Sequence, residues 1–575
     1  MTALVTEVRR GAYADSIVLM HLQSSLADLP GVQDAGVVMG TPANLELLAA
    51  GGLLDSELEP PAADDMVIAV RATSPALGEE ALAAVDRLLS NRRSEESTEF
   101  RPHGMASALR LLPDARVVAV SVPGRYAARV AEEALERGRH VFLYSDNVSV
   151  DAEVDLKKRA AARGLLVMGP DCGTAMLGGI GFGFANRVRR GAVGIVAASG
   201  TGLQAVACRV HQLGAGVSTA IGTGGRDLGQ DVGGATALQG LDVLRRDPET
   251  EVLVLVSKPP SPAVARRLLT AARACGKPVV IQFIGHGWDR EEDGNLRLAN
   301  GLDHAADLAV ELLGRSTPID RPAAAEPMEP RSGYLRGLFA GGTLALEAQQ
   351  VLAGLGEVRS NVPILGNRPP ADLTRSRGHS ILDLGSDEFT VGRLHPMMDQ
   401  ELRIRRLLQE AEDAEAGVVL LDVVLGEGSH PDPAAELAPA IEKALSAGRA
   451  DVAVLIVGTD LDPQGLDDQT ERLARAGAHV FRGVAEGLDW VARRLGIEPS
   501  PAGTSNEVPA DGSVPQGSLA RVAPEVLTGT VAAINVGLET FHRSLIEQGA
   551  RSIQLDWRPP AGGDERLMEL LEKTR

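Results

Sequence analysis

GAVGIVAASGTGLQAVA, residues 191–207, runs from a long apolar stretch into glycines and hydroxyl side chains and then into a helical pattern. GVVLLDVVLGEGSHPDPAAEL, residues 417–437, repeats the same order of features. Each stretch predicts a buried strand, a tight turn and the start of a helix, where backbone N–H groups and the helix dipole favour negative charge. Because the two turns occupy matching positions in two similar regions, we predict that they hold one anion, phosphate, between two helix starts.

The composition favours several α/β domains. With 575 residues the chain has room for three or four domains. Hydrophobic residues make up 44% of the sequence and aromatic residues only 3%, so the cores must consist mainly of Ala, Val, Leu and Ile. That composition is typical of parallel sheets whose strands are covered by helices on both faces.

Strand-like apolar runs alternate with helical intervals along most of the chain, which is the pattern of βαβ units. A stretch rich in Pro, Ala and Glu at 315–330 and a stretch rich in Pro, Gly and Ser at 499–518 predict linkers. The predicted fold class is therefore α/β with several parallel-sheet domains. We expect parallel-sheet domains at 1–170, 171–314 and 331–498, and a C-terminal extension with further strands at 519–575.

Charge and cysteine usage exclude several other classes of protein. The net charge of −20 argues against a nucleic-acid-binding face. Cys172, Cys208 and Cys275 predict no disulfide framework, and the histidines show no metal-ligand spacing. The first residues have no signal-peptide layout, and no run reaches membrane-spanning length. We therefore expect a soluble cytoplasmic protein with no nucleic-acid partner, no membrane partner and no metal.

Short strings of residues along the chain carry a family resemblance. The region from GPDCGT (169–174) to KPVVIQFIG (277–285) resembles the α subunit of succinyl-CoA synthetase, and 331–498 resembles the CoA-ligase domain of its β subunit. Over nearly its whole length the chain is similar to the FdrA family. The strings that carry this second resemblance are MGTPAN (39–44), YSDN (144–147), MGPDCGT (168–174), ASGTG (198–202), GGRDL (224–228), VSKPP (256–260), GRLHPM (392–397) and WRPPAGG (557–563).

This resemblance implies an activity and partners. The first domain would be Rossmann-like and of the CoA-binding type, and the next two domains would be flavodoxin-like and of the succinyl-CoA-ligase type. FdrA-family proteins are implied to be subunits of oxamate carbamoyltransferase, which converts oxalurate and phosphate into oxamate and carbamoyl phosphate in allantoin breakdown. We therefore expect a small anionic substrate, phosphate as co-substrate, and other subunits of a hetero-oligomeric enzyme as partners. No cofactor is required by this scheme, and CoA binding stays open.

Departures from the synthetase pattern bear on the mechanism. The chain has no ATP-grasp domain and no GxxxxGK[ST] sequence. The synthetase α subunit has a glutamate that supports a phosphorylated histidine, whereas the matching strand here ends in Ser257-Lys258-Pro259-Pro260. The histidine motif is also missing, since His286 comes too early. Retained anion-holding turns without a phosphate carrier indicate chemistry with free phosphate.

The predicted site combines the two turns with nearby cations. Lys258 and Arg226 are the predicted catalytic residues, because phosphate attack on a ureido carbonyl builds negative charge on its oxygen. Arg226 and then Arg393 are the candidates to bind the substrate carboxylate. The predicted phosphate contacts are Ser199, Gly200, Thr201, Gly202, Gly426, Gly428 and Ser429, and the predicted substrate contacts are Gly224, Gly225, Arg393 and Asp171.

Simpler interpretations stay open beside these. The turn at Ser199 could serve packing alone, Lys258 could be a solvated loop lysine, and Arg226 could pair with Asp227 or Asp231. For the function, one alternative is an NDP-forming acyl-CoA synthetase α-like subunit that needs a separate ATP-grasp partner. Another is a non-catalytic scaffold that keeps an inherited fold.

Overall fold

The chain forms two compact units in a computed structural model. The first unit consists of Met1–Ser107, Glu388–Leu394 and Leu555–Arg575, and the second of Ala108–Asp387 and His395–Gln554. Most of the two predicted linkers lies outside the described residues. The structure describes residues 3–12, 16–27, 29–40, 44–45, 48–49, 52–54, 60–62, 65–95, 101–288, 290–314, 328–390, 394–500, 504–506 and 520–559.

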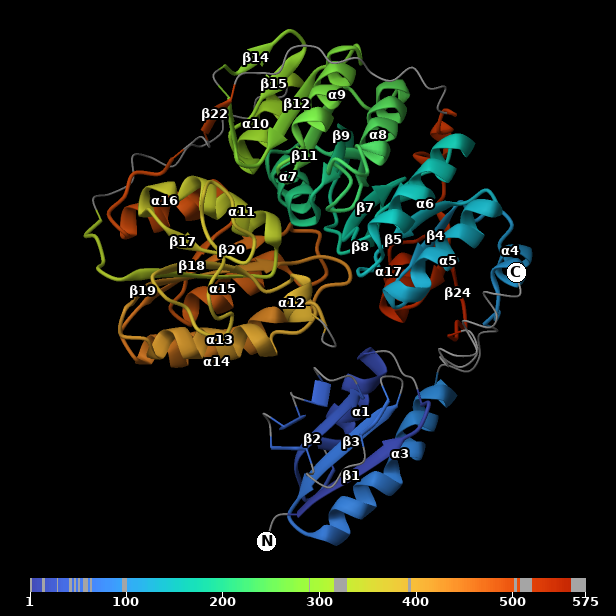
Figure 1. The fold of residues 1–575 in the computed structure, drawn as a ribbon, viewed down its shortest axis with the longest axis vertical. Helices are drawn as coiled ribbons and strands as arrows, with labels where there is room; N and C mark the ends of the chain where they lie inside the picture. Colours follow the sequence, from blue (N-terminus) through green and yellow to red (C-terminus); the bar gives the residue numbers. More distant parts are fainter. Residues whose placement is uncertain are drawn as a thin grey trace. The chain divides into compact units, whose positions relative to one another are not determined.

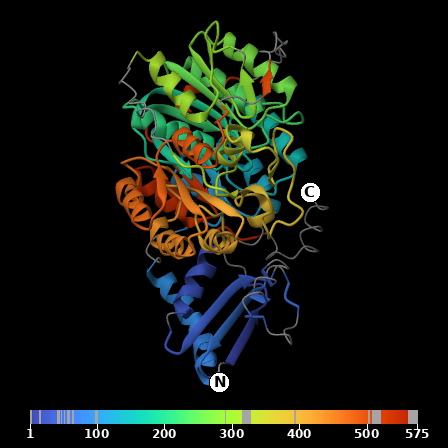
Figure 2. The same ribbon diagram turned by 90° about the vertical axis from the view of Figure 1, so that its left-hand side faces the viewer.

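The first unit contains a small antiparallel sheet of order β1-β3-β2. Its strands are β1 (Ala3–Arg9), β2 (Val32–Met39) and β3 (Met66–Ala72), and the helices α1 (Ser16–Ala27) and α3 (Pro75–Glu95) pack against it (Figure 2). The prediction of one Rossmann-like domain over 1–170 is therefore wrong for this part of the chain. Only the central strand β3 is nearly continuously buried, whereas a parallel sheet covered on both faces would bury all of its strands.

A Rossmann-like parallel sheet does occur in the second unit, and the C-terminal segment completes it. The order is β24-β23-β4-β5-β6, so strands from 532–554 lie beside strands from 117–168 (Figure 1). The predicted C-terminal extension is thus an integral half of this sheet. Its elements are β4 (Val117–Val120), β5 (His140–Leu143), β6 (Val167–Met168), β23 (Ala532–Val536) and β24 (Arg551–Gln554), with α4 (Met105–Leu111), α5 (Gly124–Glu136), α6 (Val150–Arg163), η2 (Pro524–Val526) and α17 (Glu539–Glu547).

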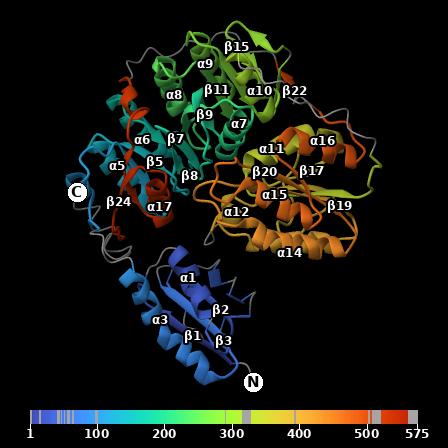
Figure 3. The ribbon, with the colours of Figure 1, turned by 180° about the vertical axis from the view of Figure 1, so that it is seen from behind.

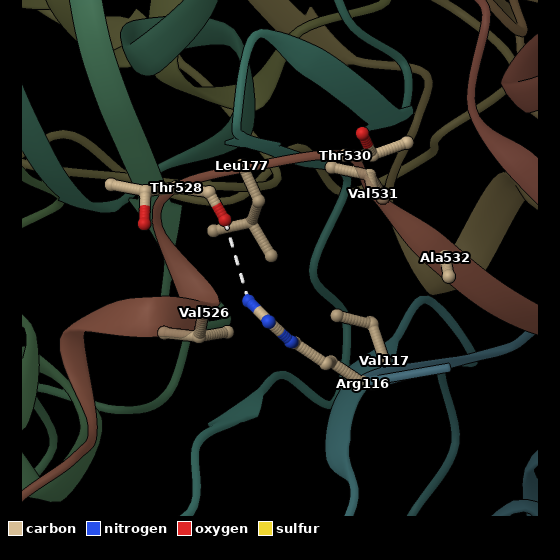
Figure 4. Close-up of a pocket in the computed structure, with 8 residues that line it drawn as sticks. All are labelled: Arg116, Val117, Leu177, Val526, Thr528, Thr530, Val531 and Ala532. Carbon is tan, nitrogen blue, oxygen red and sulfur yellow. Dashed lines mark hydrogen bonds between the residues drawn. The ribbon is translucent and has the colours of Figure 1, made fainter. Parts of the chain in front are cut away.

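Arg116 holds the C-terminal segment against this sheet through hydrogen bonds. Its guanidinium points into a pocket lined by Val117, Leu177 and residues 526–532 (Figure 4). There it donates hydrogen bonds to the carbonyl oxygens of Glu525 and of Thr528, the latter at 3.3 Å. An arginine just before β4 therefore satisfies backbone carbonyls of a segment some 400 residues away in sequence.

The next sheet has eight strands in the order β14-β15-β12-β11-β9-β10-β7-β8. Its central strands β10, β9, β11 and β12 are parallel and follow the flavodoxin-like order. Helices α7 and α10 cover one face, and α8 and α9 cover the other (Figure 3). The elements are β7 (Thr174–Leu177), β8 (Ile180–Gly183), β9 (Arg190–Ala198), α7 (Gly200–Gln212), β10 (Val217–Gly222), α8 (Ala235–Arg246), β11 (Val252–Ser257), α9 (Pro262–Arg273), β12 (Val279–Phe283), β14 (Glu292–Asp293), β15 (Leu296–Leu298) and α10 (Leu302–Leu312), and β13 (His286–Trp288) pairs separately with β22 (Thr504–Asn506).

The last sheet has six parallel strands in the order β17-β18-β16-β19-β20-β21, again flavodoxin-like. Helices α11 and α16 lie on one face, and α13, α14 and α15 lie on the other (Figure 1). The predicted α/β fold class is confirmed. The elements are β16 (Tyr334–Phe339), α11 (Gly342–Val351), η1 (Ala353–Leu355), β17 (Val358–Arg359), β18 (His379–Asp383), α12 (Asp387–Thr390), α13 (Glu401–Glu412), β19 (Ala416–Val424), α14 (Pro433–Ser446), β20 (Asp451–Val457), α15 (Leu466–Arg475), β21 (His479–Phe481) and α16 (Val484–Arg494).

The two flavodoxin-like sheets share one apolar core. Leu203 and Val206 of α7, Leu344 of α11 and Leu488 of α16 belong to the same cluster of buried side chains. Because this cluster is continuous, helices α7 and α11 keep a fixed relative position.

None of the helices in the described part of the chain is long and apolar enough to cross a membrane.

Shortening a side chain on β23 should test whether the C-terminal strands are integral to the fold. Ile534 is fully buried at the centre of β23, so Ile534→Ala should lower the free energy of unfolding by about 2–5 kcal/mol. Ile546→Ala is the matched control, because Ile546 on α17 is 47% exposed and its loss should change stability by no more than about 0.5 kcal/mol. Urea denaturation measures both. Equal effects of the two substitutions would contradict the arrangement.

Candidate functional site

Each flavodoxin-like sheet has a point at which successive strands are added in opposite directions. This switch point lies between β9 and β11 in the eight-stranded sheet and between β16 and β19 in the six-stranded sheet. Open α/β sheets bind ligands at the carboxyl ends of the strands at such points. Helix α7 begins at the end of β9, and α11 begins at the end of β16.

The starts of α7 and α11 contact each other directly. The hydroxyl groups of Ser199 and Thr343 are hydrogen-bonded, with 2.7 Å between their oxygens. Ser199 Oγ also accepts the N–H of Gly202 at 3.1 Å and so caps α7. Thr201 packs so closely on Gly341 that a Cβ there would lie 2.5 Å from Thr201 Cγ2. The two switch points therefore meet, with hydroxyl groups between the helix starts.

The second turn of the sequence prediction is a different one. Gly426 donates its N–H to Gln464 Oε1 at 3.0 Å, and Glu427 donates its N–H to the carbonyl oxygen of Ala185 at 2.8 Å. Helix α14 begins only at Pro433. The expectation that Gly426, Gly428 and Ser429 offer N–H groups at a helix start is therefore wrong, because the segment after β8 fills that turn. Thr343 and its neighbours occupy the expected place instead.

Lys258, Asp171 and Gly225 come together beside these helix starts. Lys258 follows β11, Asp171 follows β6, and Gly225 follows β10. A Cβ placed on Gly225 would lie 3.1 Å from Asp171 Oδ2 and 3.7 Å from Lys258 Nζ. The side-chain ammonium of Lys258 makes no hydrogen bond or ion pair with any residue that the structure describes. The predicted residues Gly224, Gly225, Asp171 and Lys258 thus converge, and glycine leaves open the space between a carboxylate and an ammonium.

Gly200 links the start of α7 to this cluster. A Cβ on Gly200 would lie 3.8 Å from the Cα of Gly173 and 3.9 Å from Thr174 Oγ1, two residues that closely follow Asp171 in the chain. Gly224 has a φ of +86° and approaches the carbonyl oxygen of Pro170, so another residue is strained there. The carboxyl ends of strands from three sheets therefore meet at one location.

Asp383 is a site residue that the sequence analysis missed. It ends β18, and its carboxyl lies at the start of α11, where a Cβ on Gly342 would be 2.3 Å from Asp383 Oδ2. Its Oδ1 accepts the N–H of Gly385 at 2.9 Å. No sequence pattern singles it out, because an aspartate at the end of a buried strand is common in turns.

Loss of hydration raises the pKa values of both acids near Lys258, although only Asp383 is buried. The pKa of Asp383 rises to about 7, mainly through loss of hydration; Lys258 opposes the rise, and the nearby Asp422 and Asp171 add to it. Asp171 keeps accessible surface, but the surrounding protein removes enough water to raise its pKa to about 6, against the attraction of Lys258. Asp387 and Asp146 add to this shift. Both acids therefore hold a proton for part of the time near neutral pH.

The guanidinium of Arg226 is already hydrogen-bonded to other protein groups. Its Nε donates to Glu153 Oε2 at 3.1 Å, and its Nη2 donates to the carbonyl oxygen of Val148 at 2.7 Å. Asp227, a suggested alternative partner, instead pairs with the buried Lys157 at 2.8 Å. Arg226 still attracts Asp171 at longer range. Arg393, the other predicted carboxylate partner, lies outside the described residues.

His395 lies beside Gly385, two residues after Asp383 in the chain. Its Nε2 lies 2.6 Å from the Cβ position of Gly385, and its ring lies 5.2 Å from that of Phe184. Its Nδ1 accepts the N–H of Met397 at 3.2 Å, which assigns the proton of the neutral ring to Nε2. Burial lowers its pKa to about 4.

Comparisons with known proteins agree with this architecture. Three family models match: "AllF, heavy metal-associated domain" at 1–103, "CoA binding domain" at 188–285 and "CoA-ligase" at 338–493. The uncharacterized protein YahF of Escherichia coli K12 is 41% identical over 485 residues, which are 82% of this chain and 94% of YahF. The protein is thus built from domains of the succinyl-CoA-ligase type. It belongs to the FdrA family, as the sequence strings predict.

More distant relatives match part of the chain. The succinate–CoA ligase [ADP-forming] subunit alpha 2 of Archaeoglobus fulgidus is 31% identical over 150 residues, which are 25% of this chain and 50% of that protein. This chain thus spans about half the length of that ligase subunit. Among solved structures, a dinucleotide-forming acetyl-coenzyme A synthetase of Ca. Korarchaeum cryptofilum has 15% identity and a TM-score of 0.27, covering 66% of this chain and 81% of that chain.

The names of two family models raise the question of a metal and of CoA. Residues 1–103 contain no cysteine, because Cys172, Cys208 and Cys275 all lie beyond them. The described residues hold no group of three or more His, Cys, Asp or Glu that could bind a metal ion. The donor set therefore does not fit a thiophilic heavy metal. At the start of α7, Thr201 contacts Gly341, so no open space is left between these two residues.

The raised pKa of Asp383 predicts a pH-dependent stability. The folded chain keeps a proton on Asp383 that the unfolded chain has already lost, so this group lowers the free energy of unfolding as pH rises from about 4 to about 7. Asp383→Asn keeps an acceptor for Gly385 and should gain stability relative to the wild type over that range. The gain should reach at most roughly 4 kcal/mol, at about 1.4 kcal/mol for each pKa unit. Urea denaturation at several pH values measures it.

Asp413→Asn is a control of opposite sign. Burial works against ionisation of Asp413, but hydrogen bonds from Glu415 N–H and Arg336 outweigh it and lower the pKa. The stabilisation that this carboxylate provides is present above the unfolded pKa and is lost as pH falls, so Asp413→Asn should be less stable than the wild type at pH 7. A constant difference between Asp383→Asn and the wild type from pH 4 to 7 would contradict the proposed state of Asp383.

Proposed function

We propose that this chain is a subunit of an oxamate carbamoyltransferase-type enzyme, in which phosphate attacks the ureido carbonyl of oxalurate. The observation that carries this proposal is Lys258, a half-buried ammonium at a switch point that has no ion-pair partner among the described residues. Lys258 lies near enough to Asp171 and Asp383 to oppose the rise of their pKa values, and its N–H donors stay available for a ligand. A cation held in this way suits a small anionic substrate.

In the proposed reaction an oxygen of hydrogen phosphate forms a bond to the ureido carbon, and the bond from that carbon to the substituted nitrogen breaks. The products are carbamoyl phosphate and oxamate. Lys258 would stabilise the charge that develops on the carbonyl oxygen and on the attacking phosphate. Binding both reactants beside Gly225, where no side chain fills the space, would supply the advantage of proximity.

The departing nitrogen must gain the proton that hydrogen phosphate loses. Asp171 is our candidate for this transfer, because its pKa of about 6 allows it to carry a proton near neutral pH and because it lies next to Gly225. Asp383 would act from the other side of Lys258 and set its charge environment. No nucleophilic serine, cysteine or histidine takes part in this scheme.

A second candidate is an acyl-CoA ligase subunit of the α type. The CoA-ligase match at 338–493 and the likeness to succinate–CoA ligase α subunits favour it. It would need a separate ATP-grasp chain and a phosphorylated histidine. The exchange of a carboxylate for Lys258 and the absence of the histidine motif from the sequence argue against that chemistry. We therefore rank it second, and under either proposal the active form includes partner subunits.

Replacement of Lys258 tests the first proposal. Lys258→Met in the complex with its partner subunits should lower carbamoyl phosphate formation from oxalurate and phosphate by about 100-fold or more, because a charge-stabilising donor is lost. Lys158→Met, at an exposed position on α6, is the matched control and should retain the wild-type rate. Circular dichroism confirms that both variants fold. An undiminished rate for Lys258→Met would remove Lys258 from the site.

The same complex discriminates between the two candidates. Formation of an acyl-CoA from succinate, CoA and ATP, without any carbamoyl phosphate from oxalurate, would replace the first proposal with the second. Phosphate-dependent formation of carbamoyl phosphate without added ATP would favour the first. Colorimetric detection of the carbamoyl product and chromatography of CoA esters measure the two outcomes.

A further inference from the structure

The Rossmann-like sheet has its own switch point, which the proposed function does not use. It lies between β23 and β4, because β24 extends the sheet on one side of this pair and β5 and β6 extend it on the other. Helix α17 starts just after β23, and α5 starts just after β4. In a dinucleotide-binding sheet this is where a glycine-rich turn lets a pyrophosphate approach the start of a helix.

The turn after β4 packs directly against the turn after β23. Only Gly537 and Leu538 separate β23 from α17. A Cβ on Gly537, which has a φ of +123°, would lie 2.5 Å from Ser121 Oγ. Leu538 donates its N–H to Ser121 Oγ at 2.8 Å, and Ser121 donates its own N–H to the carbonyl oxygen of Val536 at 2.9 Å. The turns contact each other at the place where a phosphate would enter.

At this switch point the start of α17 carries a negative charge, and the start of α5 is covered by another segment of the chain. Helix α17 carries Glu539 as its first residue, and a carboxylate there repels a pyrophosphate. At the start of α5, a Cβ on Gly124 would lie only 2.1 Å from the carbonyl oxygen of Asp146 and 2.8 Å from Asn147. The guanidinium of the adjacent Arg125 lies over the ring of Tyr126, 4.9 Å from its centroid. The chain that follows β5 therefore covers the second helix start.

We infer that this chain has lost the CoA site of its domain family, because the β23/β4 switch point does not admit the pyrophosphate of CoA. Helix α17 uses the resulting surface for internal contacts. Ser544 donates to Glu427 Oε2 at 2.8 Å, and Gln548 Nε2 donates to the carbonyl oxygen of Gly181 at 3.0 Å. The Rossmann-like domain therefore makes structural contacts, through α17, with both flavodoxin-like domains. This inference goes beyond the proposed function and does not depend on it.

Calorimetric titration of the full chain with CoA tests the inference. We expect no saturable binding, with any Kd weaker than about 1 mM. The succinate–CoA ligase subunit alpha 2 of Archaeoglobus fulgidus, titrated in the same buffer, serves as the positive control for a CoA-ligase relative. The titration is repeated on the chain assembled with its partner subunits, so that a site completed by a partner is also detected.

Hydrogen exchange locates any binding that does occur. Saturable CoA binding with protection of 121–125 and 537–541, or of 199–203, would overturn the inference. Absence of saturable binding, in the chain and in the complex, would support it. Inorganic phosphate is titrated in parallel, because binding of phosphate that Lys258→Met weakens at least tenfold bears on the proposed function alone. A chain that binds neither ligand would keep the inference and count against the function.

Discussion

The contact between the starts of α7 and α11 is the constraint on which the site depends. Ser199 and Thr343 join the two helices through one hydrogen bond, and Thr201 packs on Gly341 beside it. The shared apolar core behind these residues fixes the two sheets to which the helices belong. Each helix begins at a switch point. The contact between the helices therefore brings Lys258 and Asp383, which lie at the ends of strands of different sheets, close enough to interact electrostatically.

The cluster has an unusual balance of charge. Lys258 lies among carboxyl groups, yet loss of hydration keeps two of them partly protonated near neutral pH. The cluster can therefore accept an anion without repulsion from every acid, and it retains a proton that a leaving group can take. A fully ionised set of aspartates would instead repel phosphate. Low hydration thus lowers the negative charge of Asp171 and Asp383 beside Lys258.

The sequence predicted the parts of this arrangement that follow from local pattern. The flavodoxin-like sheets, the cap at Ser199 and the convergence of Lys258 with Gly225 follow from apolar runs that end in glycine or charge. It could not predict contacts made by distant segments. The turn at Gly426 has the same local pattern as the turn at Ser199, but the segment after β8 fills it. Likewise, only tertiary packing shows that 532–554 completes a sheet begun more than 400 residues earlier.

A common change underlies these differences from the expected pattern. Backbone N–H groups that begin helices elsewhere in such folds are satisfied here by protein acceptors: Asp422 accepts those of Ala340 and Gly341, Ser199 accepts that of Gly202, and Ser121 accepts that of Leu538. Each acceptor removes part of the positive potential that would attract a phosphate. The attraction must then come from a side chain. In the proposed site Lys258 would supply it, at a switch point where Gly225 leaves space.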